Sequence, residues 1–193
     1  MLSEEEVKNL LVETEALLEG HFILSSGLRS DKYVQCAKLL MHPDKSEKIC
    51  NSLSKKIKKE NLDFDIVVSP AIGGIVAGYE VARSLKVPCI FTERVNGIFT
   101  LRRGFDVRKF KRALIVEDVI TTGKSSIECA DAIKKLGCEI SGFACIIDRS
   151  SGKSLIKNKI ISEISFDIPT YEPNQIPDYL KKINPIKPGS RDI

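Results

Sequence analysis

The chain has 193 residues, of which 42% are hydrophobic and 29% are charged. This balance is ordinary for a folded domain and excludes intrinsic disorder and collagen-like repeats, so we expect a single domain over residues 1–193. The formal net charge of +4 comes from lysines and arginines that are spread along the chain, and Trp is absent. A nucleic-acid partner is therefore not expected. The one dense basic run, Lys55–Lys59, is expected to be the solvated face of a helix.

The cysteines and the N-terminus indicate a cytoplasmic protein. No CxxC pair occurs, so the six cysteines are expected to be small buried residues in a reducing compartment: Cys36, Cys50, Cys89, Cys129, Cys138 and Cys145. The first residues, MLSEEEVKNLL, are acidic and amphipathic, unlike a signal peptide. No run of about 18 apolar residues occurs, so we expect no membrane span.

The N-terminal third is predicted to contain two helices around a hairpin. Residues 3–18 have a helical apolar stripe, which Ser3 and Glu6 would begin with a capping box. Two short apolar runs flank Ser25–Gly27 and predict a β-hairpin. A second helix is expected over Asp44–Lys59.

From residue 65 onward, apolar strands alternate with helices. Strands are expected at 65–69, 88–91, 113–116 and 140–147. This pattern predicts an α/β fold whose mainly parallel sheet is covered by helices on both faces. Ligands bind beyond the carboxyl ends of such strands. Four segments should therefore share one rim: Ser69–Gly74, Thr92–Gly104, Glu117–Gly123 and Asp148–Arg149.

The strongest functional signal is the segment Arg112–Ser126. An apolar strand leads to Glu117 and Asp118, and Thr121–Ser125 then opens a helix whose unpaired N–H groups form an anion site. Gly123 would let the backbone approach a phosphate closely. Carboxylates beside an anion site suit a ligand that carries both a phosphate and vicinal hydroxyls, because carboxylates accept hydrogen bonds from hydroxyls. A sugar phosphate carries both.

Three other interpretations of this segment compete with a sugar-phosphate site. Gly123-Lys124-Ser125 could end a Walker A loop, but the glycine required at position 118 is Asp118. The dinucleotide-binding pattern GxGxxG is absent here. A tight turn with two solvated acids is the third, although a turn alone does not require two acids after an apolar strand.

VEDVITTGKS resembles the phosphoribosyl-pyrophosphate motif of the type I phosphoribosyltransferases. Four further segments resemble, in the same order, bacterial orotate phosphoribosyltransferases: GHFILSSGLRSDKYVQCAKLL, PAIGGIVAGYEVARSL, FTERVNGIFTLRRGF and PTYEPNQIPDYLKKINPIKPGSR. The resemblance implies the type I phosphoribosyltransferase fold, with a small N-terminal hood and a mobile lid loop. It also implies transfer of phosphoribose from phosphoribosyl pyrophosphate to orotate, giving orotidine 5′-monophosphate in UMP biosynthesis.

The resemblance also implies roles for individual residues. Glu117 and Asp118 would hold the ribose hydroxyls. Thr121 and Arg149 would contact orotate, whose carboxylate suits a guanidinium. The alternative for Arg149 is a surface ion pair with Asp148. The loop around the 5′-phosphate would be Val119, Ile120, Thr121, Thr122, Gly123, Lys124 and Ser125.

Arg94 begins the implied lid, Thr92–Lys111. In the family this loop reaches the neighbouring subunit of a homodimer and contacts the diphosphate there; the alternative is a solvated loop charge. The lid lacks the Lys and His of better-known members, so Arg102 and Arg103 are the alternative cations. Relatives also often carry Lys at two positions that here are Ser25 and Gly73.

The implied catalytic residues are Asp118, Glu117 and Arg94, with Mg²⁺ bound mainly through the diphosphate and ribose and with no metal site in the protein itself. Two other functions stay open, a purine phosphoribosyltransferase and a non-catalytic regulator that senses the metabolite and binds nucleic acid. His21 and His42 are expected to be structural or surface residues. The turn Pro70–Gly74 would either face the diphosphate or simply enter a helix.

Overall fold

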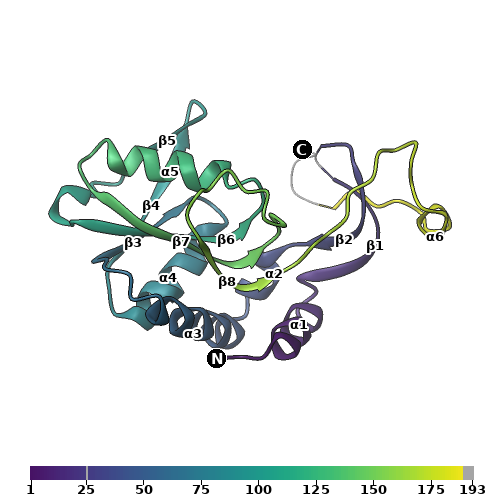
Figure 1. Cartoon of the computed structure of the whole chain (residues 1–193), viewed down its shortest axis with the longest axis horizontal. Coiled ribbons are helices and arrows are strands. Elements are labelled where there is room, and N and C mark those ends of the chain that lie inside the picture. The colour runs from purple at the N-terminus through teal and green to yellow at the C-terminus, as the bar shows by residue number, and fades with distance from the viewer. Residues whose placement is uncertain (25, 189–193) are drawn as a thin grey trace.

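A computed structural model describes residues 1–24 and 26–188, and its centre is a six-stranded sheet (Figure 1). The strands lie in the order β5-β4-β3-β6-β7-β8. Neighbouring strands are parallel except β4 and β5, which form an antiparallel hairpin. The predicted α/β class with a mainly parallel sheet is confirmed. The strand bounds are β3 Ile66–Pro70, β4 Cys89–Val95, β5 Ile98–Leu101, β6 Arg112–Ile120, β7 Glu139–Asp148 and β8 Ile160–Ser165.

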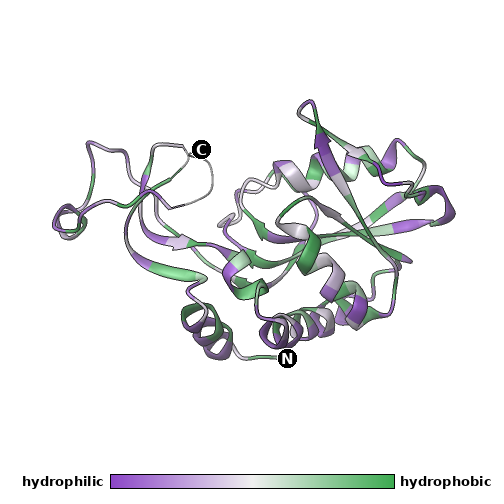
Figure 2. Ribbon diagram, turned by 180° about the vertical axis from the view of Figure 1, so that it is seen from behind, coloured by the Kyte–Doolittle hydropathy of each residue, from purple (hydrophilic) through white to green (hydrophobic). Residues whose placement is uncertain are grey.

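Helices cover both faces of this sheet. Helices α3 (Pro43–Lys59) and α4 (Gly74–Leu85) lie on one face, and α5 (Lys124–Lys134) lies on the other (Figure 1). Successive side chains of a strand point to opposite faces, and accordingly Val67 packs with the α3 and α4 core while Val68 packs with the α5 core. This burial on both faces explains the unbroken apolar runs of the central strands (Figure 2).

The first helix, α1 (Glu4–Glu13), begins with the predicted capping box, in which Ser3 Oγ accepts from the Glu6 N–H and the Glu6 carboxylate accepts from the Ser3 N–H. The helix ends earlier than the predicted residue 18, because Glu15 has a φ of 55° and turns the chain. Leu17 and Leu18 belong to strand β1 instead, where they pair with β2. Their apolar side chains fit either pattern, so the sequence did not mark the boundary.

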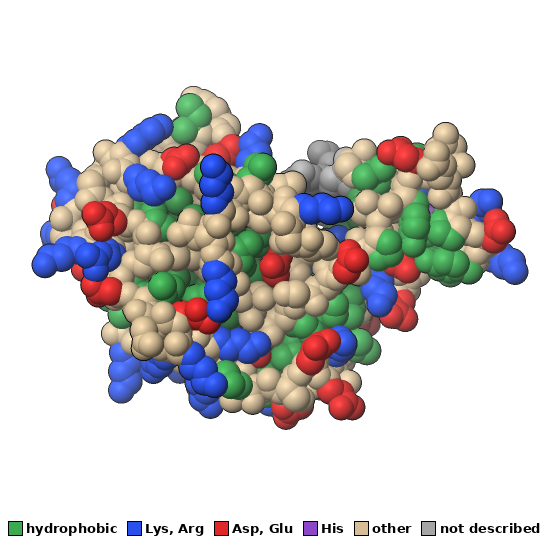
Figure 3. All heavy atoms as spheres, viewed as in Figure 1, with side chains coloured by type: hydrophobic (Ala, Val, Ile, Leu, Met, Phe, Trp, Pro, Cys, Tyr) green, Lys and Arg blue, Asp and Glu red, His purple; other side chains and the backbone are tan. Residues whose placement is uncertain are grey.

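The predicted hairpin is present as β1 (Leu17–Ile23) and β2 (Arg29–Val34), which pair antiparallel. Ser25 lies outside the described residues. The C-terminal segment packs on this hairpin: Ile23 N–H donates to the Ile186 carbonyl at 2.8 Å, and Arg29 and Tyr171 exchange two backbone hydrogen bonds. We call the hairpin with residues 171–188, which include α6 (Asp178–Lys181), the hood. It forms a separate lobe beside the sheet (Figure 3).

Several elements differ from the prediction. Strand β8, helix α2 (Cys36–Leu40) and the 3₁₀ turn Val107–Lys109 were not predicted, and β4 continues to Val95 into the expected loop. All six cysteines are free, and all but Cys89 are buried. The basic run lies on α3 as predicted, although Lys56 also donates to the Glu163 carbonyl at 2.6 Å. None of the described helices is both long enough and apolar enough to cross a bilayer.

Candidate active site

The predicted rim segments meet at the carboxyl edge of the sheet. The Ala71 N–H donates to the Thr92 carbonyl at 2.8 Å, and the Arg149 N–H donates to the Ile120 carbonyl at 2.8 Å. A Cβ built on Gly73 would lie 2.8 Å from Asp118 Oδ1. The turn before α4 therefore enters a helix and also borders the acidic pair. A lysine side chain at position 73 would meet that carboxylate.

The loop after β6 has the geometry of an anion site. Within residues 1–24 and 26–188, the backbone N–H groups of Thr121, Thr122 and Gly123 donate to no protein acceptor. Lys124 N–H donates only to the Thr122 hydroxyl, at 3.3 Å. Thr121, Thr122 and Lys124 are exposed, whereas the Ile120 side chain is buried, so Ile120 can contact a ligand only through its backbone. These unpaired groups at a helix N-terminus suit a phosphate.

Gly123 is fixed by two independent constraints. Its φ is +75°, and a Cβ would lie 2.6 Å from Ser154 Oγ and 2.8 Å from Ile156 Cγ1. Gly123→Ala should therefore destabilise the protein by about 2–4 kcal/mol, from backbone strain and overpacking together. Gly152→Ala is the matched control, because its φ is +74° but nothing lies within 4 Å. Thermal denaturation should show the larger loss for Gly123→Ala, and equal losses would contradict the packing argument.

Glu117 and Asp118 lie together near the end of β6, just before this loop, and both are half-buried. Burial raises the pKa of Glu117 to about 7; the Ser126 hydroxyl, which donates to its carboxylate, opposes this shift, while the nearby Asp118 adds to it. Burial also raises the pKa of Asp118, against hydrogen bonds from backbone N–H groups. The acids are thus partly desolvated, and hydroxyl donors of a ligand would stabilise their charged forms.

The raised pKa of Glu117 predicts a pH dependence of stability. The folded-state pKa of about 7 lies above the ordinary 4.5. The protonated Glu117 carboxyl therefore stabilises the folded protein below pH 4.5, and this stabilisation is lost as the pH rises through about 7. Glu117→Gln removes this loss. Its melting temperature relative to wild type should therefore increase from pH 5 to pH 8, by the equivalent of about 1–3 kcal/mol. A difference that is constant with pH would contradict the assignment.

A cavity of about 450 Å³ adjoins the acidic pair. The guanidinium Nε of Arg149 is buried without a hydrogen-bond partner, and burial lowers the pKa of Arg149, an effect that Tyr33 opposes. The alternative ion pair with Asp148 does not form in the described structure, where Asp148 accepts from the Ser150 N–H instead. The cavity is lined by Leu24, Ser26, Tyr33, Val34, Gln35, Cys36, Asp118, Val119, Thr121 and Arg149.

Sequence reasoning assigned Thr121 and Arg149 to the base, and both line this cavity. It did not assign Tyr33 on β2, or Gln35 and Cys36 where the chain passes from β2 into α2, to the site. No motif marks these three positions. Only the resemblance of the whole hood segment pointed to this region.

Arg94 lies away from the cavity in this conformation. Its guanidinium donates to Glu128 on α5 at 2.6 Å and to the Gly97 carbonyl at 2.7 Å, and it stacks over the Phe99 ring at 4.1 Å. Arg94 is thus an exposed charge that is paired within the chain, and its diphosphate role stays a prediction. Of the two alternative cations, Arg103 pairs bidentately with Glu93 at 2.7 and 2.8 Å.

Neither histidine lines the cavity, in keeping with the expectation that both are structural or surface residues. His21 is buried, and its Nδ1 lies 2.9 Å from the Ile183 carbonyl, which ties β1 to the C-terminal segment within the hood. His42 precedes α3 as its N-cap residue. Among the described residues, no group of three or more His, Cys, Asp and Glu side chains is placed to hold a metal.

Comparison with known proteins agrees with this geometry. Residues 39–172 match the family described as phosphoribosyl transferase domain. The chain is 47% identical to the orotate phosphoribosyltransferase of Brucella anthropi over 193 residues, the full length of both. Among solved structures, the orotate phosphoribosyltransferase of Aeropyrum pernix superposes with a TM-score of 0.72 at 21% identity, over 83% of this chain and 93% of that one. The Mycobacterium tuberculosis enzyme in complex with phosphoribosyl pyrophosphate gives 0.62 at 17% identity, over 86% and 92%. The chain belongs to the orotate phosphoribosyltransferases, within the type I phosphoribosyltransferase family.

Proposed function

We propose that the chain transfers the 5-phosphoribosyl group from phosphoribosyl pyrophosphate to orotate, forming orotidine 5′-monophosphate and pyrophosphate in UMP biosynthesis. The observation that carries this proposal is the meeting of three features in one cleft. Asp118, Thr121 of the anion loop and Arg149, whose Nε is buried, line the same cavity, and Glu117, Thr122 and Gly123 adjoin these residues along the chain. They match the phosphate, the diol and the carboxylate of the two substrates.

The chemistry needs no protein nucleophile. The bond from ribose C1 to the diphosphate breaks as the base nitrogen arrives, through an oxocarbenium-like sugar. Asp118 and Glu117 accept hydrogen bonds from the ribose hydroxyls, the loop holds the 5′-phosphate, and Arg149 holds the orotate carboxylate, so both reactants stay aligned. The two carboxylates at the cleft also fit Mg²⁺, which prefers oxygen ligands. Bound chiefly to diphosphate and ribose, Mg²⁺ would neutralise charge on the leaving group.

A spectrophotometric assay tests the function. Purified protein with phosphoribosyl pyrophosphate and Mg²⁺ should consume orotate and lose the orotate absorbance. Adenine, hypoxanthine, xanthine and uracil should not react. Turnover of one of these bases and none of orotate would overturn the base assignment, and retarded migration of RNA or DNA without turnover would favour the regulator.

We further propose a homodimer in the cytoplasm, in which Arg94 completes the neighbouring subunit's site. An exposed apolar stripe supports an interface beside the cleft: Ile72, Val76 and Tyr79 are 86%, 45% and 62% exposed, and their spacing places Val76 and Tyr79 on one side of α4. Contiguous apolar surface of this kind often marks an interface. The free, mostly buried cysteines suit a reducing compartment.

Subunit mixing tests the shared site. Arg94→Ala and Thr121→Ala should each be nearly inactive alone, and mixing them should restore about a quarter of wild-type activity, since half the subunits in a random mixture are in heterodimers and each heterodimer has one intact site. Refolded mixtures of the two variants would be assayed with orotate. No recovery, in mixtures shown to exchange subunits, would argue against a lid that acts across the dimer.

A further inference from the structure

The lid hairpin (β4, β5 and the turn at Asn96 and Gly97) is joined to helix α5 through Arg94. The Arg94 Nη2 donates to Glu128 Oε2 at 2.6 Å, and its Nη1 donates to the carbonyl of Gly97 at 2.7 Å. The guanidinium carbon lies 4.1 Å from the centroid of the Phe99 ring. A carboxylate, a carbonyl and an aromatic face thus hold the residue that the proposed function assigns to the diphosphate.

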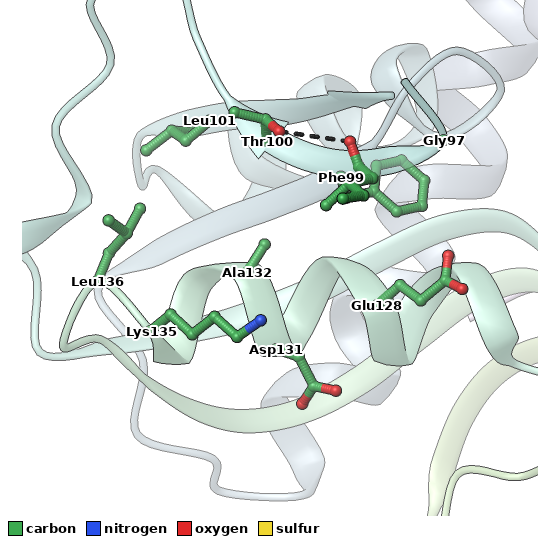
Figure 4. Close-up of a pocket in the computed structure, with 10 residues that line it drawn as sticks. Gly97, Phe99, Thr100, Leu101, Glu128, Asp131, Ala132, Lys135 and Leu136 are labelled. Carbon is green, nitrogen blue, oxygen red and sulfur yellow. Dashed lines mark hydrogen bonds between the residues drawn. The ribbon is translucent and has the colours of Figure 1, made fainter. Parts of the chain in front are cut away.

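Residues 89–92 of β4 are fixed in the sheet by β3, but beyond Thr92 the two strands of the hairpin pair, among the described strands, only with each other. A cavity of about 580 Å³ lies between β5 and α5 (Figure 4). Ile98, at the start of β5, is 69% exposed, whereas Phe99, beneath the Arg94 guanidinium, is buried. Segments with few buried apolar contacts open at low free-energy cost. The part of the hairpin beyond Thr92, which β3 does not hold, is therefore the part that can move once Arg94 is released.

Glu128 resembles the expected ligand of Arg94 in chemistry. A carboxylate and a diphosphate both present paired anionic oxygens to a guanidinium. Glu128 lies on the helix that carries the phosphate loop at its N-terminus, one turn beyond Lys124. The Lys124 Nζ lies 3.9 Å from Glu128 Oε1, so the carboxylate keeps a cation nearby when Arg94 leaves. The ion pair of Arg94 and Glu128 is partly exposed, with side-chain exposures of 41% and 33%. Such exposed ion pairs are weak enough to exchange readily.

We infer that Glu128 is a positioning residue that stands in for the diphosphate: it holds Arg94 and the lid hairpin in a resting position, and the diphosphate displaces it. This inference rests on the proposed function, in which Arg94 binds the diphosphate. Glu128 then sets how much of the substrate's binding free energy is spent on releasing the lid.

Glu128→Gln should lower the KM for phosphoribosyl pyrophosphate about two- to fivefold, the range set by an exposed ion pair, and leave the KM for orotate unchanged. Asp131→Asn is the matched control, because Asp131 lies one turn further along α5, carries the same charge and pairs with Lys134 at 3.9 Å rather than with Arg94. A general effect of charge on α5 would lower the KM in both variants. If Glu128 acts as a latch, holding Arg94 until the diphosphate displaces it, the KM falls only in Glu128→Gln.

Lid movement can be followed without turnover. The chain contains no Trp, so Ile98→Trp introduces a single tryptophan on the hairpin, and its selectively excited emission would be titrated with pyrophosphate and Mg²⁺. Adding Glu128→Gln should lower the titration midpoint about two- to fivefold, and adding Asp131→Asn should not.

Three results would be decisive against the proposals. Unchanged midpoint and KM in Glu128→Gln would overturn the latch, as would an emission that pyrophosphate does not alter. If Arg94→Ala leaves the KM for phosphoribosyl pyrophosphate unchanged in an active enzyme, the assigned role of Arg94 fails instead. The orotate assay separates these three results from a failure of the proposed reaction.

Discussion

Asp118→Asn should reduce kcat/KM at least about 100-fold. Hydrogen bonds to a charged group contribute about 1.5–3 kcal/mol each, and the carboxylate is expected to accept from two ribose hydroxyls. The loss should fall on kcat as well as on KM, because the diol must be held while the sugar gains positive charge. Steady-state kinetics with orotate would measure both parameters.

The same variant should fold at least as well as the wild type. Burial raises the pKa of Asp118, which means that the folded protein disfavours the charged carboxylate, and the amide has nearly the same shape. Its melting temperature at pH 8 should therefore equal or exceed that of the wild type. Wild-type kinetics in Asp118→Asn would remove this residue from the site, whereas an unfolded variant would contradict the electrostatic argument.

Arg149→Ala should raise the KM for orotate by about 30-fold to several thousand-fold. Removing one partner of a buried, hydrogen-bonded charge pair costs about 2–5 kcal/mol, and the Arg149 Nε is already buried without a protein partner. The KM for phosphoribosyl pyrophosphate should change little, because the phosphate loop and the acids stay in place.

Two variants make the Arg149 experiment specific. Arg149→Lys keeps the charge but loses the planar fork, so it should recover only part of the affinity. Lys153→Ala removes an exposed cation four residues away and should leave the KM for orotate unchanged. A normal KM for orotate in Arg149→Ala would reassign the base pocket.

The sequence predicted the parts of the fold and site that depend on local pattern. Apolar strands followed by polar turns placed Glu117, Asp118 and Arg149 at one rim, because parallel strands share the direction of their carboxyl ends. Gly123 was expected for close approach to a phosphate, and the structure adds a second reason in Ser154 and Ile156. No local sequence pattern predicts the contact of Gly123 with Ser154 and Ile156, because Gly123 and Ser154 are 31 residues apart in the chain.

Features that depend on distant contacts were not predicted. The β1–β2 hairpin packs against the C-terminal part of the hood, and Tyr171 and Ile186 meet β2 and β1 only in the folded chain. Arg94 was expected from the family resemblance to reach a diphosphate, but its pairing with Glu128 joins residues 34 apart in sequence. The end of α1 was misplaced because Leu17 suits a helix stripe and a strand equally well.

The space available at Gly73 makes positions 73 and 118 interdependent. A Cβ at position 73, in the turn before α4, would lie 2.8–2.9 Å from both carboxylate oxygens of Asp118. A lysine grafted there to supply the cation that relatives often carry would first have to displace an acid expected to hold the sugar. The effect of Gly73→Lys should therefore depend strongly on the residue at position 118. This chain could acquire that cation only if its acidic pair rearranged.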